Sequence, residues 1–194
     1  MFLKKRADIL GVVLAGGRSS RFGSNKALAL FQGVSFVERT LKVMDALFDE
    51  VVVVTNTPET YQSCHHRIFQ DMMPYAGPMG GLVTAFEKTS YDRLLVVACD
   101  MPLLDTQGIQ GIIAQDDGDA VIPVHDGIAE SLMALYHRDL LPDLKTSLSQ
   151  EQRSLRKFFS GRPGVSWLPM AGKTWLNVNT REALQDLENV HATD

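Results

Sequence analysis

Residues 9–26 join a short apolar run to a glycine-rich, basic turn. The run at 9–14 is continuously apolar, which is typical of a strand buried on both faces of a parallel sheet. Glycines allow the following backbone to take positive φ and to approach an anion closely, and they stand at Gly16, Gly17 and Gly23. Three cations surround the same turn, namely Arg18, Arg21 and Lys26. Because an ordinary turn gains nothing from three cations within nine residues, the pattern predicts a strand that feeds a phosphate-binding loop.

The spacing of this loop excludes two better-known phosphate-binding motifs. The P-loop requires G-x-x-x-x-G-K-[ST], whereas Gly23 is followed by Ser24 and Asn25 before Lys26, and Ala27 takes the Ser/Thr place. The dinucleotide fingerprint G-x-G-x-x-G is also absent, since the glycines fall at other spacings.

Residues 14–26 resemble the signature loop of a family of nucleotidyltransferases, which attach a nucleoside monophosphate to a phosphorylated acceptor. The family pattern is L-A-G-G-x-S-x-R-[MF]-G-x-[DN]-K, and this chain reads L-A-G-G-R-S-S-R-F-G-S-N-K. Asn25 stands where the family more often carries Asp. The resemblance implies that Arg21 and Lys26 are catalytic and that Lys26 holds the nucleotide phosphates. It also implies that the nucleotide is held by the backbone of Leu14, Ala15, Gly16 and Gly17.

Composition narrows the class of protein and its partners. The 194 residues are 45% hydrophobic and 22% charged, as expected for one globular domain spanning 1–194. The formal net charge of −4 argues against general nucleic-acid binding. We expect no membrane partner, because no apolar run approaches the roughly 20 residues of a membrane span. The two cysteines form no C-x-x-C pair, so a reduced cytoplasm is the expected location.

Apolar runs alternate with helical spacing along the chain. Strands are predicted at 51–55, 67–69, 94–98, 119–124, 132–136 and 165–168. Helices are predicted at 34–48, after Thr57, after the loop at 71–81, and at 105–115, 140–148, 154–159 and 181–188. This order predicts a three-layer α/β fold with a mostly parallel sheet and an antiparallel excursion near 119–136. The resemblance makes it a Rossmann-like nucleotidyltransferase fold.

Polar residues at predicted strand ends are the candidate ligand groups. Asn56 follows the strand at 51–55, and Asp71 opens a loop that contains Gly77 and Gly81. That loop resembles the G-P-[LM]-x-G-[LM] motif of molybdenum cofactor guanylyltransferases, which implies that Asp71 contacts the nucleotide. The alternative is that Asp71 only caps a turn.

Asp100 follows the apolar strand at 94–98, where a carboxylate can hold Mg²⁺ against a phosphate. Strand-end carboxylates can also be simple caps, but the phosphate loop at the end of the first strand favours the metal role. The segment C-D-M-P resembles the family's metal motif and is closer to guanylyltransferases than to cytidylyl relatives, which usually read D-Q-P.

The segment at 174–181 resembles the family motif F-x-N-[IV]-N-T-P-E, with Arg181 in place of the proline. Asn177 and Asn179 alternate about one residue, so we expect them to share a face. Asn179 or Thr180 can cap the last helix. Capping accounts for one asparagine, and the second can reach the acceptor or metal-bound water.

A basic cluster precedes this segment and consists of Arg153, Arg156, Lys157 and Arg162. It is either a solvated basic helix or a binding site for an anionic acceptor such as a pterin phosphate.

The resemblance extends from Leu14 to about Leu184 and is closest to molybdenum cofactor guanylyltransferase. It implies that the terminal phosphate of molybdopterin attacks the α-phosphorus of GTP, giving the guanine dinucleotide cofactor and pyrophosphate. Implied partners are GTP, molybdopterin, Mg²⁺ and other molybdenum cofactor biosynthesis proteins. Two alternatives stay open: a cytidylyl or sugar-nucleotide transferase with the same loop, and a nucleotide-binding regulator without turnover.

Overall fold

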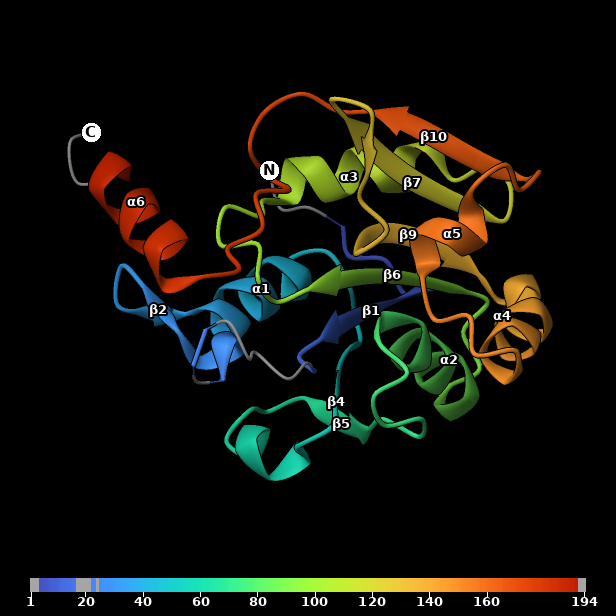
Figure 1. The fold of residues 1–194 in the computed structure, drawn as a ribbon, viewed down its shortest axis with the longest axis horizontal. Helices are drawn as coiled ribbons and strands as arrows, with labels where there is room; N and C mark the ends of the chain where they lie inside the picture. The colour runs from blue at the N-terminus through green and yellow to red at the C-terminus, as the bar shows by residue number, and fades with distance from the viewer. Residues whose placement is uncertain (1–3, 17–21, 24, 192–194) are drawn as a thin grey trace.

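A computed structural model describes residues 4–16, 22–23 and 25–191 of the chain. One sheet organises it, with strand order β10-β7-β9-β6-β1-β4-β5 (Figure 1). These strands are β1 (Ile9–Leu14), β4 (Val51–Thr55), β5 (Arg67–Gln70), β6 (Arg93–Ala98), β7 (Ala120–His125), β9 (Met133–His137) and β10 (Val165–Pro169). The short β8 (Ile128–Ala129) pairs with β7, and β2 (Leu30–Phe31) forms a separate hairpin with β3 (Val34–Ser35).

The sheet is parallel except at β9 and at the short β8, which is antiparallel to β7. Strand β1 pairs in parallel with both β4 and β6, and β4 pairs in parallel with β5. Strand β9 is antiparallel to both β6 and β7, while β10 is parallel to β7. The expected mostly parallel sheet with an antiparallel excursion is therefore confirmed.

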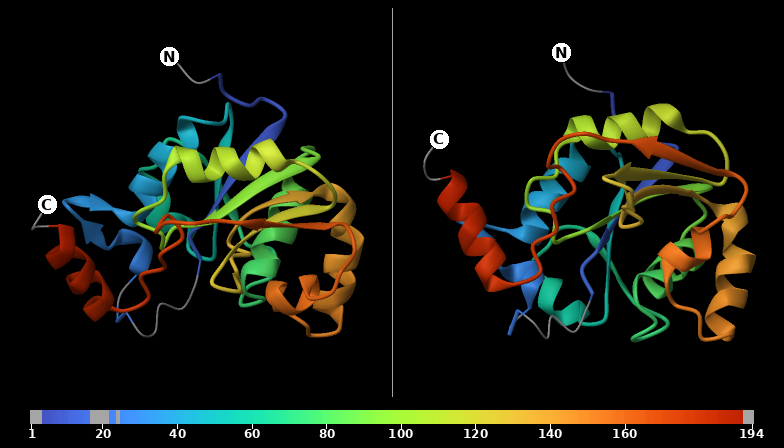
Figure 2. Two further views of the ribbon diagram at one scale, coloured as in Figure 1. Left: turned by 90° about the horizontal axis from the view of Figure 1, so that it is seen from above. Right: turned by 45° about the horizontal axis from the view of Figure 1, so that its top comes forward.

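Helices cover both faces of the sheet (Figure 2). They are α1 (Phe36–Asp45), α2 (Pro78–Lys88), α3 (Thr106–Gln115), α4 (Leu141–Ser149), α5 (Leu155–Phe159) and α6 (Arg181–His191). Three single-turn 3₁₀ helices complete the described elements, namely η1 (Lys26–Leu28), η2 (Pro58–Tyr61) and η3 (Arg138–Leu140).

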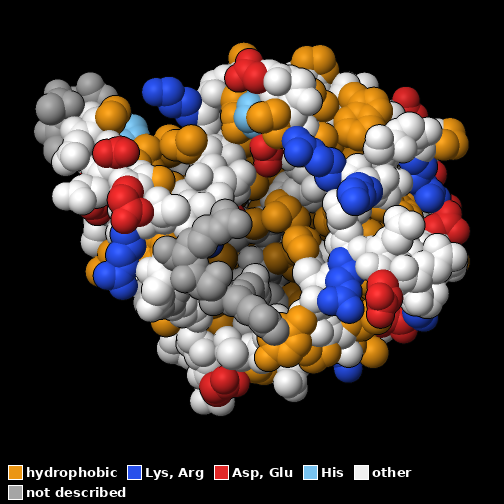
Figure 3. Space-filling model, viewed as in Figure 1, with side chains coloured by type: hydrophobic (Ala, Val, Ile, Leu, Met, Phe, Trp, Pro, Cys, Tyr) orange, Lys and Arg blue, Asp and Glu red, His pale blue; other side chains and the backbone are white. Residues whose placement is uncertain are grey.

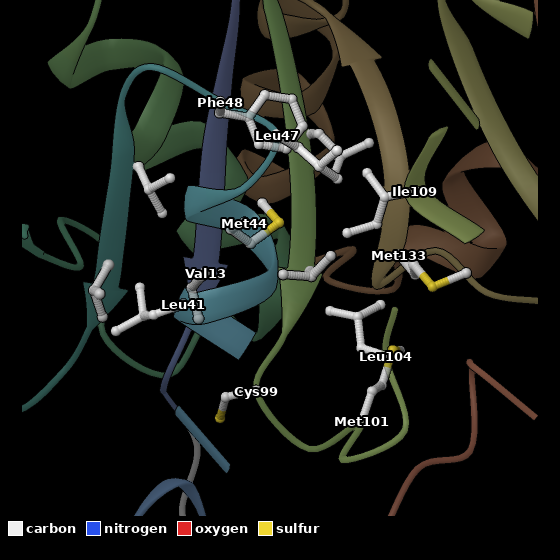
Figure 4. Packing of buried hydrophobic residues seen from close by; sticks show 14 of the residues in the cluster. Val13, Leu41, Met44, Leu47, Phe48, Cys99, Met101, Leu104, Ile109 and Met133 are labelled. Atoms are coloured by element: carbon white, nitrogen blue, oxygen red, sulfur yellow. The ribbon is translucent and has the colours of Figure 1, made fainter. Parts of the chain in front are cut away.

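Alternation along β1 divides the core into two layers, because successive side chains of a strand point to opposite faces. Ile9 and Val13 pack with α1 and α3 on one face, and Figure 4 shows Val13 in the same cluster as Leu41 and Met44 of α1 and Ile109 of α3. Leu10, Val12 and Leu14 of β1 pack with α2, α4 and α5 on the other face. Burial of β1 on both faces explains why its sequence is an unbroken apolar run.

A third, smaller cluster attaches the C-terminal helix beside the β2–β3 hairpin. Phe22, Phe31 and Phe36 pack there with Val178 and Leu187, and Figure 1 shows α6 next to β2. This packing brings the segment before α6 back toward the strand ends.

Several predicted boundaries are wrong by a few residues. Helix α1 begins at Phe36, where Ser35 and Glu38 form a capping box. The loop expected at 71–81 ends at Gly77, because Pro78 already begins α2. Thr57 makes no side-chain cap to η2.

Within the ranges described above, none of the helices has the length and apolar character needed to cross a bilayer.

Candidate active site

A cavity of about 950 Å³ lies at the carboxyl ends of β1, β4 and β6. Its walls come from the strand ends and the loop before α2, and they include Leu14, Gly16, Asn56, Asp71, Gly77, Gly81 and Asp100. Figure 3 shows this face hollowed, with hydrophobic side chains inside the hollow and Lys or Arg side chains on part of its rim. A cavity of this size at the carboxyl ends of parallel strands is the usual ligand position in open α/β folds.

Two glycines let the cavity wall close tightly. A Cβ on Gly81 would lie 2.9 Å from a methyl group of Leu14, so only glycine lets the first turn of α2 approach β1 this closely. Gly77, which precedes α2, has φ of 72°, a conformation that side chains disfavour. Both glycines therefore shape the wall whether or not a ligand touches them.

Lys26, Asp100 and Asn179 converge at the cavity from three distant parts of the chain. Lys26 Nζ lies 2.5 Å from Asp100 Oδ2 and donates to Asn179 Oδ1 at 2.9 Å. The side chains of Lys26 and Asp100 are only 17% and 13% exposed. The backbone N–H of Val178 donates to the carbonyl of Asp100 at 2.9 Å, which fixes the segment that carries Asn179.

Asp100 keeps one acceptor that the described residues do not use. Its Oδ1 is buried and has no hydrogen-bond partner among them. Across the same described ranges, no group of three or more His, Cys, Asp or Glu side chains gathers to bind a metal. Because Mg²⁺ is usually held by one or two carboxylates plus substrate phosphates and water, a single aspartate with an unused oxygen fits that ion.

Asp71 takes the turn-capping role that the sequence left as its alternative, and it also lines the cavity. The side chain is 8% exposed, and its Oδ1 accepts from the Met73 N–H at 2.9 Å and from Thr84 Oγ1 at 3.0 Å. These bonds hold the carboxylate rigidly at the wall.

Ala15 contributes differently from the expectation. Its N–H donates to the Val54 carbonyl, and its carbonyl accepts from the hydroxyls of Thr55 and Tyr61. Because both backbone groups are engaged within the fold, Ala15 shapes the cavity wall and Gly16 is the next residue that can offer backbone to a ligand.

Asn177 and Asn179, which were expected to share a face, have different partners, and residues 177–179 belong to no strand. The Asn177 amide donates to Glu130 and to the Trp175 carbonyl, whereas Asn179 lines the cavity. Thr180 caps α6 through the Ala183 N–H, as one of the two expected options.

Two other predicted residues, Gly17 and Arg21, lie outside the described residues. Of the basic cluster, Arg153 lines the cavity and donates to the Tyr75 carbonyl at 3.3 Å. Arg162 instead pairs with Asp143. The cluster therefore does not act as one surface.

Sequence reasoning missed several lining residues, including Thr55, Tyr75, Cys99 and Leu132. Thr55 is the last residue of the predicted strand at 51–55 and Cys99 is the first residue after the one at 94–98, so the strand-end rule could have found them. Burial raises the pKa of Cys99 to about 12. The thiol is therefore protonated near neutral pH and is no nucleophile.

Comparison with known proteins gives the family. A model described as the MobA-like NTP transferase domain matches residues 11–165. Proteins named "Probable molybdenum cofactor guanylyltransferase" are similar along the chain. The one from Bacillus cereus (strain AH187) is 34% identical over 195 residues, covering 92% of this chain and 97% of that protein. The one from Bacillus cytotoxicus is 31% identical over 193 residues, covering 93% and 96%.

The fold is shared with a crystal structure of molybdopterin-guanine dinucleotide biosynthesis protein A from Archaeoglobus fulgidus. The TM-score is 0.81 at 20% identity, and the match covers 95% of this chain and 100% of that one. The chain therefore belongs to the MobA-like NTP transferase family of nucleotidyltransferases.

Proposed function

We propose that this protein transfers GMP from GTP to the terminal phosphate of molybdopterin and releases pyrophosphate. The observation that carries the proposal is the convergence of Lys26, Asp100 and Asn179 on one cavity wall, with an acceptor oxygen of Asp100 unused by the described residues. The names of relatives that match more than 90% of the chain support the choice of substrates.

The reaction requires no protein nucleophile. An oxygen of the acceptor phosphate forms a bond to the α-phosphorus of GTP as the bond from that phosphorus to the β-phosphate oxygen breaks, and pyrophosphate leaves. Catalysis is then positioning and electrostatic stabilisation. Lys26 would hold the phosphate chain and strengthen its contact as negative charge moves toward the leaving group.

Asp100 would be the protein ligand of Mg²⁺, because nucleotidyltransferases of this family generally use a divalent metal and its unused oxygen suits a hard cation. When bound, Mg²⁺ supplies charge neutralisation for the phosphates of the nucleotide. Because an ammonium group has three N–H donors, Lys26 would share its charge between Asp100 and the phosphates as the nucleotide enters.

Guanine selection would come from the rigid wall at Asp71. A carboxylate or a backbone carbonyl can accept from guanine N1–H and its exocyclic amine, whereas adenine has no N1–H to donate. A buried acceptor left unpaired rejects the wrong base strongly. Arg153, which also lines the cavity and donates to the Tyr75 carbonyl, would offer positive charge to an anionic acceptor.

We also propose that residues 1–194 work as one nucleotidyltransferase domain in the cytoplasm, alongside other molybdenum cofactor biosynthesis proteins. The cysteines at 64 and 99 are both unpaired thiols, which agrees with a reducing compartment.

The test is pyrophosphate release from GTP, ATP or CTP, each with Mg²⁺ and with or without molybdopterin. We expect release only with GTP and molybdopterin together, accompanied by the guanine dinucleotide product. Release with CTP instead would make the protein a cytidylyltransferase. Tight nucleotide binding with no turnover on any of the three nucleotides would make it a regulator.

A further inference from the structure

Tyr61 is a buried phenol that touches both flanks of the glycine-rich segment. It is the last residue of η2 and only 1% exposed. Its hydroxyl donates to the carbonyl of Ala15 at 3.0 Å and accepts from the side-chain amide of Asn25 at 3.2 Å. Ala15 follows β1 and Asn25 precedes η1, so a single oxygen joins the backbone of one residue to the side chain of another ten positions further along the chain.

We propose that Tyr61 is a positioning residue for the phosphate site, because it fixes the end of β1 relative to the start of η1, where Lys26 lies. The inference rests on the proposed function, in which Lys26 binds the nucleotide phosphates.

Each partner of Tyr61 leads directly to the cavity. The Ala15 carbonyl also accepts from Thr55 Oγ1 at 3.0 Å, and both residues line the cavity. Asn25 Oδ1 accepts from the Ala27 N–H at 3.1 Å and so caps η1, whose first residue is Lys26. The series of hydrogen bonds therefore runs from the Tyr61 hydroxyl through the Asn25 side chain to the Ala27 N–H, next to Lys26 in η1.

The count of protons explains why an asparagine suits position 25 in this chain. Burial raises the pKa of Tyr61 to about 12, so the phenol is protonated near neutral pH and has one hydrogen to donate. The 3.0 Å bond to the Ala15 carbonyl is shorter than the 3.4 Å contact with Asn25 Oδ1, so that hydrogen goes mainly to Ala15, and the hydroxyl oxygen accepts from the Asn25 amide. An ionised aspartate has no hydrogen to donate, so it would compete with the Ala15 carbonyl for the phenol proton.

The decisive comparison is Tyr61→Phe against Tyr136→Phe. Tyr136 is also fully buried, and its hydroxyl also donates to a backbone carbonyl, that of Ser131, but it does not line the cavity. Each substitution removes one buried hydroxyl and keeps the aromatic ring. A merely structural role for Tyr61 would therefore give the two variants the same phenotype.

Three quantities are measured on the full chain: GTP affinity with Mg²⁺ by calorimetry, kcat and KM for pyrophosphate release, and amide exchange at Ala27 and Leu28. We expect Tyr61→Phe to weaken GTP binding roughly three- to tenfold, the range that one lost hydrogen bond allows. Amide exchange at η1 should become faster in the same variant. Tyr136→Phe should lower the melting temperature and leave GTP affinity and η1 exchange as in the parent.

Asn25→Asp tests the proton count. It keeps the acceptor for Ala27 and removes the donor to Tyr61. Made in the parent protein, Asn25→Asp should therefore weaken GTP binding. Made in the Tyr61→Phe protein, it should cause a smaller further loss of GTP affinity. Such non-additivity is the signature of residues in direct contact.

The proposal is overturned if Tyr61→Phe matches the parent in GTP affinity and η1 exchange, or if Tyr136→Phe reproduces its losses. If the parent protein neither binds GTP nor releases pyrophosphate, the proposed function fails. The exchange comparison then still decides whether Tyr61 holds η1.

Discussion

Lys26 and Asp100 neutralise each other's charge across 2.5 Å, although they are 74 residues apart in sequence. Our proposal gives the same two groups a second set of partners, phosphate for the lysine and metal for the aspartate. Asn179 accepts from Lys26 and therefore helps to hold the lysine near the cavity. At the residue scale, the site is a set of three side chains with complementary charge and hydrogen bonding.

Lys26→Ala should lower turnover by about 10²–10³-fold, the cost of losing one preorganised donor to developing negative charge, roughly 2.7–4 kcal/mol. The side chain sits at a cavity wall, where water can reach Asp100 after the substitution, so the fold should persist. The measurement is kcat for pyrophosphate release, with circular dichroism as the check on folding. Parent-like turnover in a folded variant would remove Lys26 from the mechanism.

Asp100→Asn should weaken the dependence of nucleotide binding on Mg²⁺ and should depress turnover far more than GTP affinity. The amide nearly keeps the shape of the carboxylate and removes its charge, and the metal matters most as pyrophosphate leaves. The measurements are Mg²⁺ titrations of GTP binding and of kcat.

Asp105→Asn is the matched control for Asp100→Asn. Asp105 caps α3 by accepting from the Gly108 N–H at 2.8 Å and does not line the cavity. This variant should keep the parent Mg²⁺ dependence. If Mg²⁺ titrations of Asp100→Asn and the parent superimpose at similar turnover, Asp100 is only a strand-end cap.

At the element scale, α1 and α2 begin in different ways. Helix α1 begins with a complete capping box, in which Ser35 Oγ accepts from the Glu38 N–H and Glu38 Oε2 accepts from the Ser35 N–H. Helix α2 has no side-chain cap and begins at Gly77 and Pro78, which face the cavity. Uncapped backbone N–H groups at a helix start favour anions, so this end of α2 adds to the electrostatics of the site.

Ser35→Ala should lower the free energy of unfolding by about 1 kcal/mol, the typical cost of losing an N-cap. For a chain of this size that loss corresponds to a fall of roughly 2–4 °C in melting temperature. Thermal unfolding measures it, and the Mg²⁺ and GTP dependence of turnover should stay unchanged. A variant as stable as the parent would show that the capping box does not stabilise α1.

The same cap should depend on pH in a defined direction. Hydrogen bonds from Ser35 lower the pKa of Glu38 below its ordinary value of 4.5. The contribution of the ionised Glu38 carboxylate to the free energy of unfolding is therefore complete above pH 4.5 and is lost as the pH falls through the lowered pKa. The difference in stability between the parent and Ser35→Ala should shrink in that acid range and stay constant from pH 6 to 8.

At the scale of the whole molecule, one sheet brings together residues that the chain keeps far apart. The order β6-β1-β4-β5 aligns four parallel strands, so the segments after β1, β4, β5 and β6 emerge at one edge. The cluster of phenylalanines under α6 then returns the C-terminal segment to the same edge. The cavity therefore exists only when the whole sheet is formed, and a ligand in it should stabilise the entire fold.

GTP with Mg²⁺ at about 100 times its dissociation constant should add roughly 2.7 kcal/mol of stability, since the ligand binds only the folded protein. The melting temperature should rise by roughly 5–10 °C. ATP and CTP at the same concentration should give clearly smaller shifts if the wall at Asp71 selects guanine. Equal shifts with GTP and ATP would contradict the assignment of base preference.

Local sequence patterns by themselves determined the longer strands of the sheet, most of the α-helices and the candidate strand ends, but not the two-residue strands β2, β3 and β8. The apolar run at 9–14, the glycine-rich turn after it and the polar residues at 56, 71 and 100 are all set by short-range rules of burial and turn formation, and the structure places 56, 71 and 100 on one cavity. A strand buried on both faces requires a continuous apolar run, so its ends can be read without knowing its neighbours.

Only the tertiary structure decided which of these groups meet and which are engaged elsewhere. The pairing of Lys26 with Asp100 and Asn179 depends on strand order and on the packing of α6, and no local pattern encodes either. Asn177 is held by Glu130 and the Trp175 carbonyl, whereas Asn179 accepts from Lys26, and no local pattern distinguishes these two asparagines. Tyr61 showed no signal in sequence, because its hydroxyl bonds to a side chain 36 residues away and to a backbone carbonyl 46 residues away, and only the folded sheet brings these groups within hydrogen-bond distance.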